Sequence, residues 1–139
     1  MISWLVDTGP LFAYLYSKDP HHSAVAARID AFTGRLVTTS PVMTGAMHFL
    51  AAVPEGPTRL AQLTIRSHIQ VFDFTQPQQL VQASALMHKY AGTSMDFADA
   101  TLVLLAEELE VLDILTIDRR GFSTFRTPNG KRFNLVLDA

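Results

Sequence analysis

The sequence predicts an α/β fold, with a mostly parallel sheet covered by helices on both faces. Short strand-like runs alternate with segments of helical periodicity, which is typical of βαβ units. Of the 139 residues, 48% are hydrophobic and 17% are charged, so a sizeable core is expected rather than disorder. Neither an internal repeat nor a Pro/Gly/Ser-rich linker divides the chain. We therefore expect residues 1–139 to form one domain.

Apolar runs of strand length predict the sheet, and apolar residues recurring at a period near 3.6 predict the helices. The expected strands are 2–6, 36–39, 70–74, 112–117 and 133–137. The expected helices are 22–32, 42–53, 58–68, 77–90 and 97–109. Ser40 followed by Pro41 indicates a helix start, because a hydroxyl oxygen suits the N-cap and proline suits the first turn.

Composition excludes several classes of function. The apolar runs are about five residues long, whereas a membrane-spanning helix needs roughly 20. The N-terminus has no basic region followed by a long apolar one, so we expect a cytoplasmic protein that makes no membrane contact. The absence of cysteine excludes disulfides, thiolate metal sites and cysteine nucleophiles.

The order of charges says more about nucleic acid than the net charge of −2 does. Residues 119–137 carry five cations and no acid, and they follow a stretch rich in acids. This basic strip is either a surface that holds the phosphates of a nucleic acid or a solvated loop and edge strand.

Four aspartates are expected at one edge of the sheet. Asp7 and Asp118 each directly follow a predicted strand, while Asp96 and Asp99 stand at the start of the helix at 97–109. Ligands of open α/β sheets bind beyond the carboxyl ends of the strands. Structural roles compete with binding, since Asp96 and Asp118 would serve as caps and Asp99 would complement a helix dipole.

A cluster of these acids requires compensation. Two carboxylates about 5 Å apart repel each other by roughly 3 kcal/mol at an effective dielectric near 20. Either protons or a divalent cation must relieve this repulsion, and oxygen ligands without cysteine favour Mg²⁺ or Mn²⁺ over zinc. Such cations activate water and stabilise charge on a phosphoryl group, so phosphodiester hydrolysis is the natural chemistry.

Two other kinds of site fit less well. A haloacid-dehalogenase-type phosphatase needs a second aspartate two residues after the first, and Gly9 stands there. A histidine-ligated zinc site would start from His21 and His22, but adjacent residues diverge on a helix and no third ligand has matching spacing.

Four segments together carry a family resemblance. They are Leu5-Val6-Asp7-Thr8-Gly9, Thr38-Thr39-Ser40-Pro41-Val42, Met95-Asp96-Phe97-Ala98-Asp99-Ala100 and Leu115-Thr116-Ile117-Asp118-Arg119-Arg120-Gly121-Phe122. In this order and spacing they resemble the PIN-domain ribonucleases, specifically the VapC-type toxins of bacterial toxin–antitoxin pairs. The resemblance implies a three-layer sandwich with a parallel sheet of strand order 3-2-1-4-5, an acidic Mg²⁺ or Mn²⁺ site, and cleavage of RNA that leaves a 5′-phosphate and a 3′-hydroxyl.

The resemblance also assigns roles to individual residues. The expected catalytic and metal-site acids are Asp7, Asp99 and Asp118, with Asp96 as an additional metal-site acid. The expected supporting hydroxyls are Thr8, Thr116 and Ser40. Within the basic strip, the expected RNA-binding cations are Arg119, Arg120 and Lys131.

Expected partners are an RNA substrate, a cognate antitoxin protein and a second copy of the chain. Apolar residues in the early helical region exceed what one helix face needs, so they form either core or a patch for a protein partner. These residues are Leu11, Phe12, Tyr14, Leu15 and Tyr16.

One position departs from the family pattern. Family members carry a glutamate in the helix after the second strand, and Gly45 stands where it is expected. Glycine inside a helix costs roughly 0.8 to 1 kcal/mol relative to alanine, so folding does not favour it. A natural variant, an introduced inactivating substitution and a displaced alignment all explain it. The alternative to an active nuclease is therefore a PIN module that binds RNA or an antitoxin-like protein with weak cleavage or none.

Overall fold

A computed structural model describes residues 1–138 and confirms the α/β class. Five parallel strands form one sheet in the order β3-β2-β1-β4-β5, which is the order that the family resemblance implies. The strands are β1 (Ser3–Val6), β2 (Arg35–Thr39), β3 (Gln70–Phe72), β4 (Asp113–Leu115) and β5 (Asn134–Leu135). The last three are shorter than the apolar runs that predict them, and residues of those runs such as Phe74, Thr116 and Phe133 are buried without belonging to a strand.

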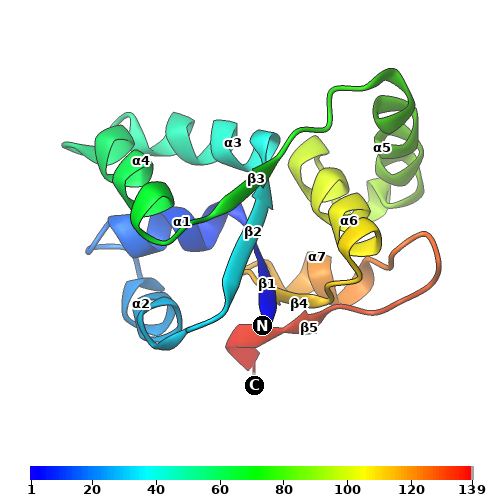
Figure 1. Cartoon of the computed structure of the whole chain (residues 1–139). Helices are drawn as coiled ribbons and strands as arrows, with labels where there is room; N and C mark the ends of the chain where they lie inside the picture. The colour runs from blue at the N-terminus through cyan, green and yellow to red at the C-terminus, as the bar shows by residue number, and fades with distance from the viewer. Residues whose placement is uncertain (139) are drawn as a thin grey trace.

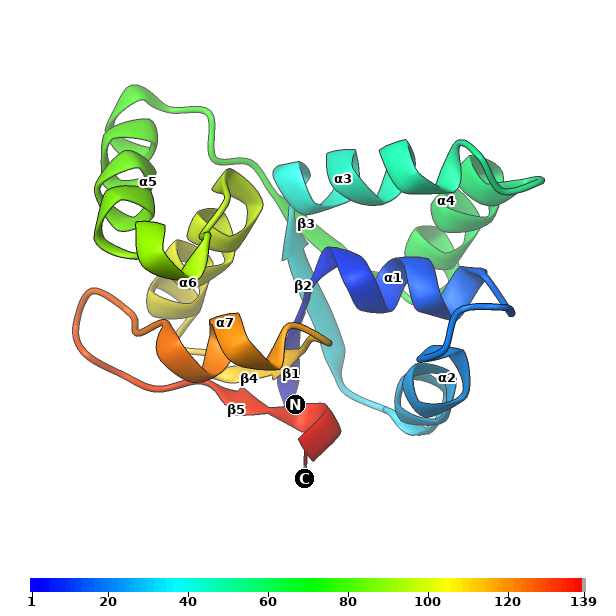
Figure 2. The ribbon, with the colours of Figure 1, turned by 180° about the vertical axis from the view of Figure 1, so that it is seen from behind.

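Helices flank this sheet on both faces (Figures 1 and 2). They are α1 (Thr8–Leu15), α2 (His22–Ala31), α3 (Ser40–Leu50), α4 (Gly56–Arg66), α5 (Pro77–Lys89), α6 (Phe97–Leu109) and α7 (Arg119–Thr124), with short 3-10 turns η1 (Ala91–Thr93) and η2 (Val136–Asp138). The views place α1 to α4 on one side of the sheet and α5 and α6 on the other, with α7 beside η1. Within residues 1–138, no helix has the length and apolar character needed to cross a bilayer.

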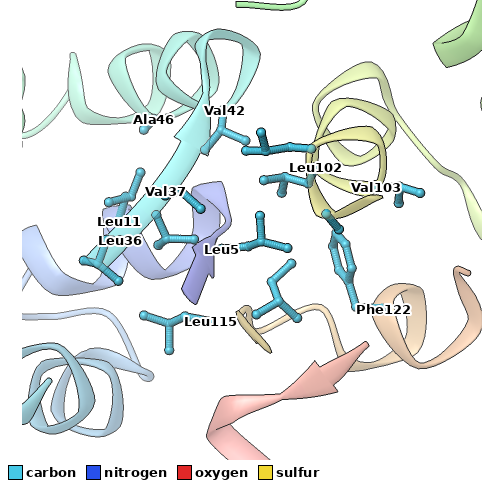
Figure 3. Close-up of a cluster of buried hydrophobic side chains, with 14 of the residues drawn as sticks. Leu5, Leu11, Leu36, Val37, Val42, Ala46, Leu102, Val103, Leu115 and Phe122 are labelled. Carbon is cyan, nitrogen blue, oxygen red and sulfur yellow. The ribbon is translucent and has the colours of Figure 1, made fainter. Parts of the chain in front are cut away.

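The core lies between the sheet and its two helical layers (Figure 3). Leu5 of β1 and Val37 of β2 are fully buried in the central strands. Leu11 of α1 packs on one side and Leu102 of α6 on the other, and both are also fully buried. Burying a side chain of this kind contributes roughly 1.5 to 3 kcal/mol, so these contacts stabilise the packing of both helical layers on the sheet.

The start of α3 differs from the expectation. Thr39 is the N-cap and Ser40 is the first helical residue, so Ser40 does not cap the helix. Its hydroxyl donates instead to the carboxylate of Asp73, which follows β3. Pro41 does lie in the first turn, as predicted.

The sequence did not predict α7, which replaces the expected loop after Asp118. Six residues are too few to show helical periodicity, yet Phe122 and the following Phe125 are fully buried. Their rings pack edge to face with centroids 5.1 Å apart. Tertiary packing of these two rings therefore stabilises a helix that local pattern does not reveal.

Candidate active site

Asp7 is held rigidly at the carboxyl end of β1. Its backbone N–H donates to the carbonyl oxygen of Leu115 at 3.0 Å, and its carboxylate accepts the N–H of Thr8 at 2.8 Å as the N-cap of α1. The second carboxylate oxygen accepts the hydroxyl of Thr116 at 2.8 Å. With 8% of its surface exposed, Asp7 is a buried acid whose two oxygens are both oriented.

Thr116 connects Asp7 to Asp118. Its hydroxyl oxygen accepts the N–H of Asp118 at 3.0 Å while donating to Asp7. Asp118 in turn caps α7 by accepting the N–H of Gly121 at 3.0 Å. A Cβ atom at Gly121 would lie 2.3 Å from a carboxylate oxygen of Asp118, so only glycine permits this approach. The predicted supporting role of Thr116 thus has a specific geometry.

Asp96 and Asp99 form a capping box at the start of α6. The carboxylate of Asp96 accepts the N–H of Asp99 at 2.8 Å, and the carboxylate of Asp99 accepts the N–H of Asp96 at 3.1 Å. The structural role that competes with binding is therefore real for both residues. Each cap uses one oxygen of its carboxylate.

All four predicted acids line one cavity of about 1040 Å³. Thr8, Ser40 and Gly45 line it too, so the carboxyl ends of β1 and β4 and the start of α6 meet here as the topology predicts. Thr116 lies buried beneath Asp7 rather than at the surface of the cavity.

Burial and mutual repulsion raise the pKa of two of these acids. Loss of hydration raises the pKa of Asp7 from 3.8 to about 6, and the nearby charges of Asp118 and Asp96 add to this effect. The pKa of Asp99 is raised from 3.8 to about 8, first by burial and then by the charges of Asp7 and Asp96. The site therefore retains a proton near neutral pH unless another positive charge enters it.

The predicted RNA-binding cations lie outside this cavity. Arg119, the first residue of α7, pairs with Asp138 at 3.2 Å, and 75% of its side chain is exposed. Arg120 and Lys131 are exposed and do not line the cavity. The structure thus brings the acids together in one cavity and leaves the three cations outside its lining.

Carboxylate oxygens, which all four acids carry, are the donors that a hard divalent cation prefers. Over residues 1–138, no three His, Asp or Glu side chains already converge as a ligand set. The donor chemistry nevertheless fits, because four carboxylates share one cavity and two of them have a raised pKa. His22, a candidate for the zinc site, is the first residue of α2. Its ring hydrogen-bonds the carbonyl oxygen of Ala13 on α1 at 2.7 Å and does not line the acidic cavity.

The site contains residues that sequence reasoning missed. Beneath it, the hydroxyls of Thr39 and Thr101 share a hydrogen bond of 2.8 Å that joins β2 to α6, and both side chains are fully buried. Aromatic side chains, Phe12 and Phe49 among them, line the cavity. Phe12 follows Thr8 by four residues and Phe49 follows Gly45 by four. Because residues i and i+4 share a helix face, this spacing was the signal that could have placed both rings at the site.

Gly45 faces Thr8 across the gap between α3 and α1. A Cβ atom at Gly45 would lie 3.4 Å from two side-chain atoms of Thr8, which is ordinary contact. Because Gly45 also lines the cavity, a longer side chain here has room to reach it.

Comparison with known proteins agrees with this fold. The family model described as "PIN domain" matches residues 4–126, so the chain belongs to the PIN-domain family. The chain is similar to Ribonuclease VapC26 of Mycobacterium tuberculosis (strain ATCC 25618 / H37Rv), with 31% identity over 136 residues that cover 95% of this chain and 98% of that protein. This confirms the resemblance to VapC-type proteins.

A solved structure gives the same result for the fold. The crystal structure of Mycobacterium tuberculosis VapC20, described as a sarcin-ricin loop cleaving toxin, superposes with a TM-score of 0.76. The match covers 87% of this chain and 95% of that one at 15% identity. At this identity the similarity concerns the fold.

Proposed function

We propose that this chain is a divalent-metal-dependent endoribonuclease that hydrolyses RNA phosphodiester bonds as the toxin of a toxin–antitoxin pair. One observation carries the proposal: Asp7, Asp96, Asp99 and Asp118 come from three segments of the chain and line one cavity, in which burial and neighbouring carboxylates raise the pKa of Asp7 and Asp99. The similarity to Ribonuclease VapC26 supports the choice of RNA as substrate.

Asp7, Asp99 and Asp118, with Asp96 beside them, would hold Mg²⁺ or Mn²⁺. Asp96, Asp99 and Asp118 each use one oxygen for capping, which leaves the second oxygen for a ligand. A bound cation would supply a more acidic water and would neutralise charge at the phosphate. Thr116 would keep Asp7 in place by its hydrogen bond to one carboxylate oxygen.

The metal requirement is tested by RNA cleavage with Mn²⁺, with Mg²⁺ and after chelation. We expect cleavage with either cation, loss of cleavage in excess chelator and recovery when the cation is restored. Cleavage that persists in chelator with unchanged rate would exclude a metal role for the four acids.

Arg119, Arg120 and Lys131 are proposed to hold RNA phosphates outside the cavity. The ion pair of Arg119 with Asp138 is exposed, and such pairs contribute little, so the guanidinium is easily released. Neutralising the three cations should flatten the dependence of RNA affinity on salt, because each phosphate contact releases counterions. An unchanged slope would remove these residues from the RNA-binding surface.

Protein partners are proposed for two other surfaces. A cavity of about 700 Å³ between α1, α2 and α4 is lined by Tyr14, Ile65 and Arg66 among others, and we assign it to the antitoxin. Leu80 and Val81 are exposed on α5, and we assign them to a homodimer contact. Light scattering of wild type and Val81→Asp tests the second assignment, since an unchanged dimeric mass would reject it.

Gly45 favours a second candidate, a PIN module that binds RNA or an antitoxin with little cleavage. The two are separated by measuring Mn²⁺ affinity and RNA cleavage for the wild-type chain and for Gly45→Glu, with Gly45→Gln as a control of similar size. Cleavage by Gly45→Glu alone would establish the weak module and the role of the lost carboxylate. Cleavage by wild type would establish the nuclease, and the absence of metal binding and cleavage in both would reject it.

A further inference from the structure

Two helices present aromatic rings in a row that leads away from the acids. Thr8 and Phe12 on α1 are followed at the same interval of four residues by Tyr16 at its C-cap, and Gly45 and Phe49 on α3 have this interval too. Figure 2 shows α1 and α3 lying side by side. The two rows meet at Gly45 and Thr8, because a Cβ atom added at Gly45 would lie 3.4 Å from the side chain of Thr8.

One turn further along, the aromatic rings meet. The rings of Phe12 and Phe49 have centroids 6.4 Å apart and planes inclined by 75°, so Phe12 supports Phe49 edge to face. Tyr16 continues the row at 5.3 Å from Phe12. Phe49 is 58% exposed, whereas its neighbours Ala46 and Leu50 on α3 are fully buried. The ring of Phe49 is therefore supported but not needed by the core.

The charge of the cavity excludes one way of holding RNA there. Phe12 and Phe49 line the same cavity as the acids, and its charged lining residues within residues 1–138 are all aspartates, without Lys, Arg or His. These aspartates are Asp7, Asp19, Asp96, Asp99 and Asp118. The cavity offers the phosphates flanking the cleaved bond no Lys, Arg or His side chain, which favours contacts to the bases for this part of the substrate.

The exposed aromatic surface has the size of a base rather than of a protein partner. Phe49 presents a single ring, and of the other exposed residues near it on α3, Thr44 and His48 are polar while Met47 lies outside the cavity. A specific protein interface buries about 800 Å² on each partner, far more than one ring offers. A planar base stacks on one aromatic face and gains roughly 1 to 3 kcal/mol, which is a fivefold to 150-fold change in affinity.

We propose that Phe49, supported by Phe12, stacks on an unpaired nucleobase next to the phosphodiester held at the acids. This inference rests on the proposed ribonuclease function and assigns it a base-binding subsite. The substrate would be single-stranded RNA or an unpaired loop, because a base inside a duplex cannot present its face to the ring. The row formed by Phe12 and Tyr16 fixes the direction in which the strand leaves the acids.

The test measures binding separately from cleavage. A short single-stranded RNA with one 2-aminopurine, moved along the strand in successive oligonucleotides, is titrated with the Asp99→Asn chain, and fluorescence quenching reports stacking. At one position we expect strong quenching, which Phe49→Ala in the same background abolishes while weakening affinity roughly tenfold. Phe49→Tyr should restore both. Met47→Ala, on the same helix but outside the cavity, should change neither.

An RNA with an abasic site at that position gives the matched control on the ligand. The Asp99→Asn chain should bind this abasic RNA as weakly as the same chain with Phe49→Ala binds the intact RNA. Combining the abasic RNA with Phe49→Ala should cause no further loss of affinity. Unchanged affinity and quenching in Phe49→Ala would overturn the subsite. A change in molecular mass by light scattering with unchanged RNA affinity would instead identify a protein interface and would also overturn it.

Failure of the subsite and failure of the proposed function are distinguishable. If the wild-type and Gly45→Glu chains never cleave RNA but show quenching that depends on Phe49, the nuclease proposal fails and the base-binding subsite stands. If RNA is cleaved with the same kcat/KM by wild type and Phe49→Ala, the subsite is rejected and the nuclease stands.

Discussion

The helices α5 and α6 begin in the same way with different chemistry. Each has 13 residues, and in each the N3 side chain accepts the N-cap N–H at 3.1 Å. In α5 the pair is Gln76 and Gln79, which are uncharged, and in α6 it is Asp96 and Asp99. Capping therefore requires an oxygen at these positions but not a charge.

The difference between the two helices lies in their surroundings. The box of α5 lies outside the acidic cavity, whereas that of α6 lines it together with Asp7 and Asp118. Burial and neighbouring charge raise the pKa of Asp99 to about 8, so its ionised form is disfavoured in the folded chain. A charge that folding neither needs nor favours is evidence for binding a cation.

The largest expected effect comes from making α6 resemble α5. Asp99→Asn keeps an oxygen for the cap but removes the charge, so the helix should still form. RNA cleavage should fall roughly 100-fold or more, because loss of a metal ligand should cost at least as much activity as loss of a residue that only supports a ligand. Cleavage is measured in the wild-type and Gly45→Glu backgrounds. Gln79→Ala, at the equivalent position of α5, should leave the cleavage rate unchanged. Equal rates for Asp99→Asn and its parent would show that the acid of α6 only caps.

The next effect is on stability and follows from the raised pKa of Asp7. Between 3.8 and about 6 the folded chain binds more protons than the unfolded chain, so the free energy of unfolding falls as the pH rises through this range. The fall in the free energy of unfolding amounts to roughly 3 kcal/mol once Asp7 is fully ionised. Asp7→Asn should therefore raise stability at pH 8 by about 1 to 3 kcal/mol in chelator.

Urea unfolding at pH 5 and pH 8 measures this effect. Glu108→Gln removes one exposed carboxylate of α6 and should change stability by less than about 0.5 kcal/mol at either pH. A loss of stability at pH 8 in Asp7→Asn would show that the hydrogen bonds of the ionised carboxylate outweigh its burial.

The smallest expected effect is at the cap of α5. Gln79→Ala removes the side chain that accepts the N–H of Gln76 and should lower the free energy of unfolding by about 0.5 to 1 kcal/mol. Urea unfolding detects this change, and the RNA cleavage rate should stay at the wild-type value. A stability loss above about 2 kcal/mol would mean that the cap of α5 is more than a local feature.

The same contrast explains what the sequence could predict. Asp7 and Asp118 directly follow strands, and parallel strands end at one edge, so their shared cavity follows from topology. Ser40 could not be placed in the same way, since its partner Asp73 is 33 residues away in sequence. The position of Arg119 likewise depends on where Asp138 lies at the end of the chain.

The local sequence pattern also could not predict the surroundings of individual side chains. Phe12 and Phe49 carry the spacing of ordinary core residues, and only the packing of α1 against α3 leaves Phe49 exposed at the cavity. Helix α7 depends in the same way on the burial of Phe122. Motif order thus predicted the acids, while contacts between distant helices determined the rest of the cavity.

Proton release on cation binding tests the central claim most directly. Mn²⁺ is titrated into the chain by calorimetry at pH 7 in two buffers with different ionisation enthalpies, which gives the number of protons released. Because the pKa of Asp99 is about 8, saturable binding should release about one proton at pH 7, fewer at pH 9, and none from residue 99 in Asp99→Asn. No saturable binding, or the same proton release from wild type and Asp99→Asn, would contradict a cation site built on these acids.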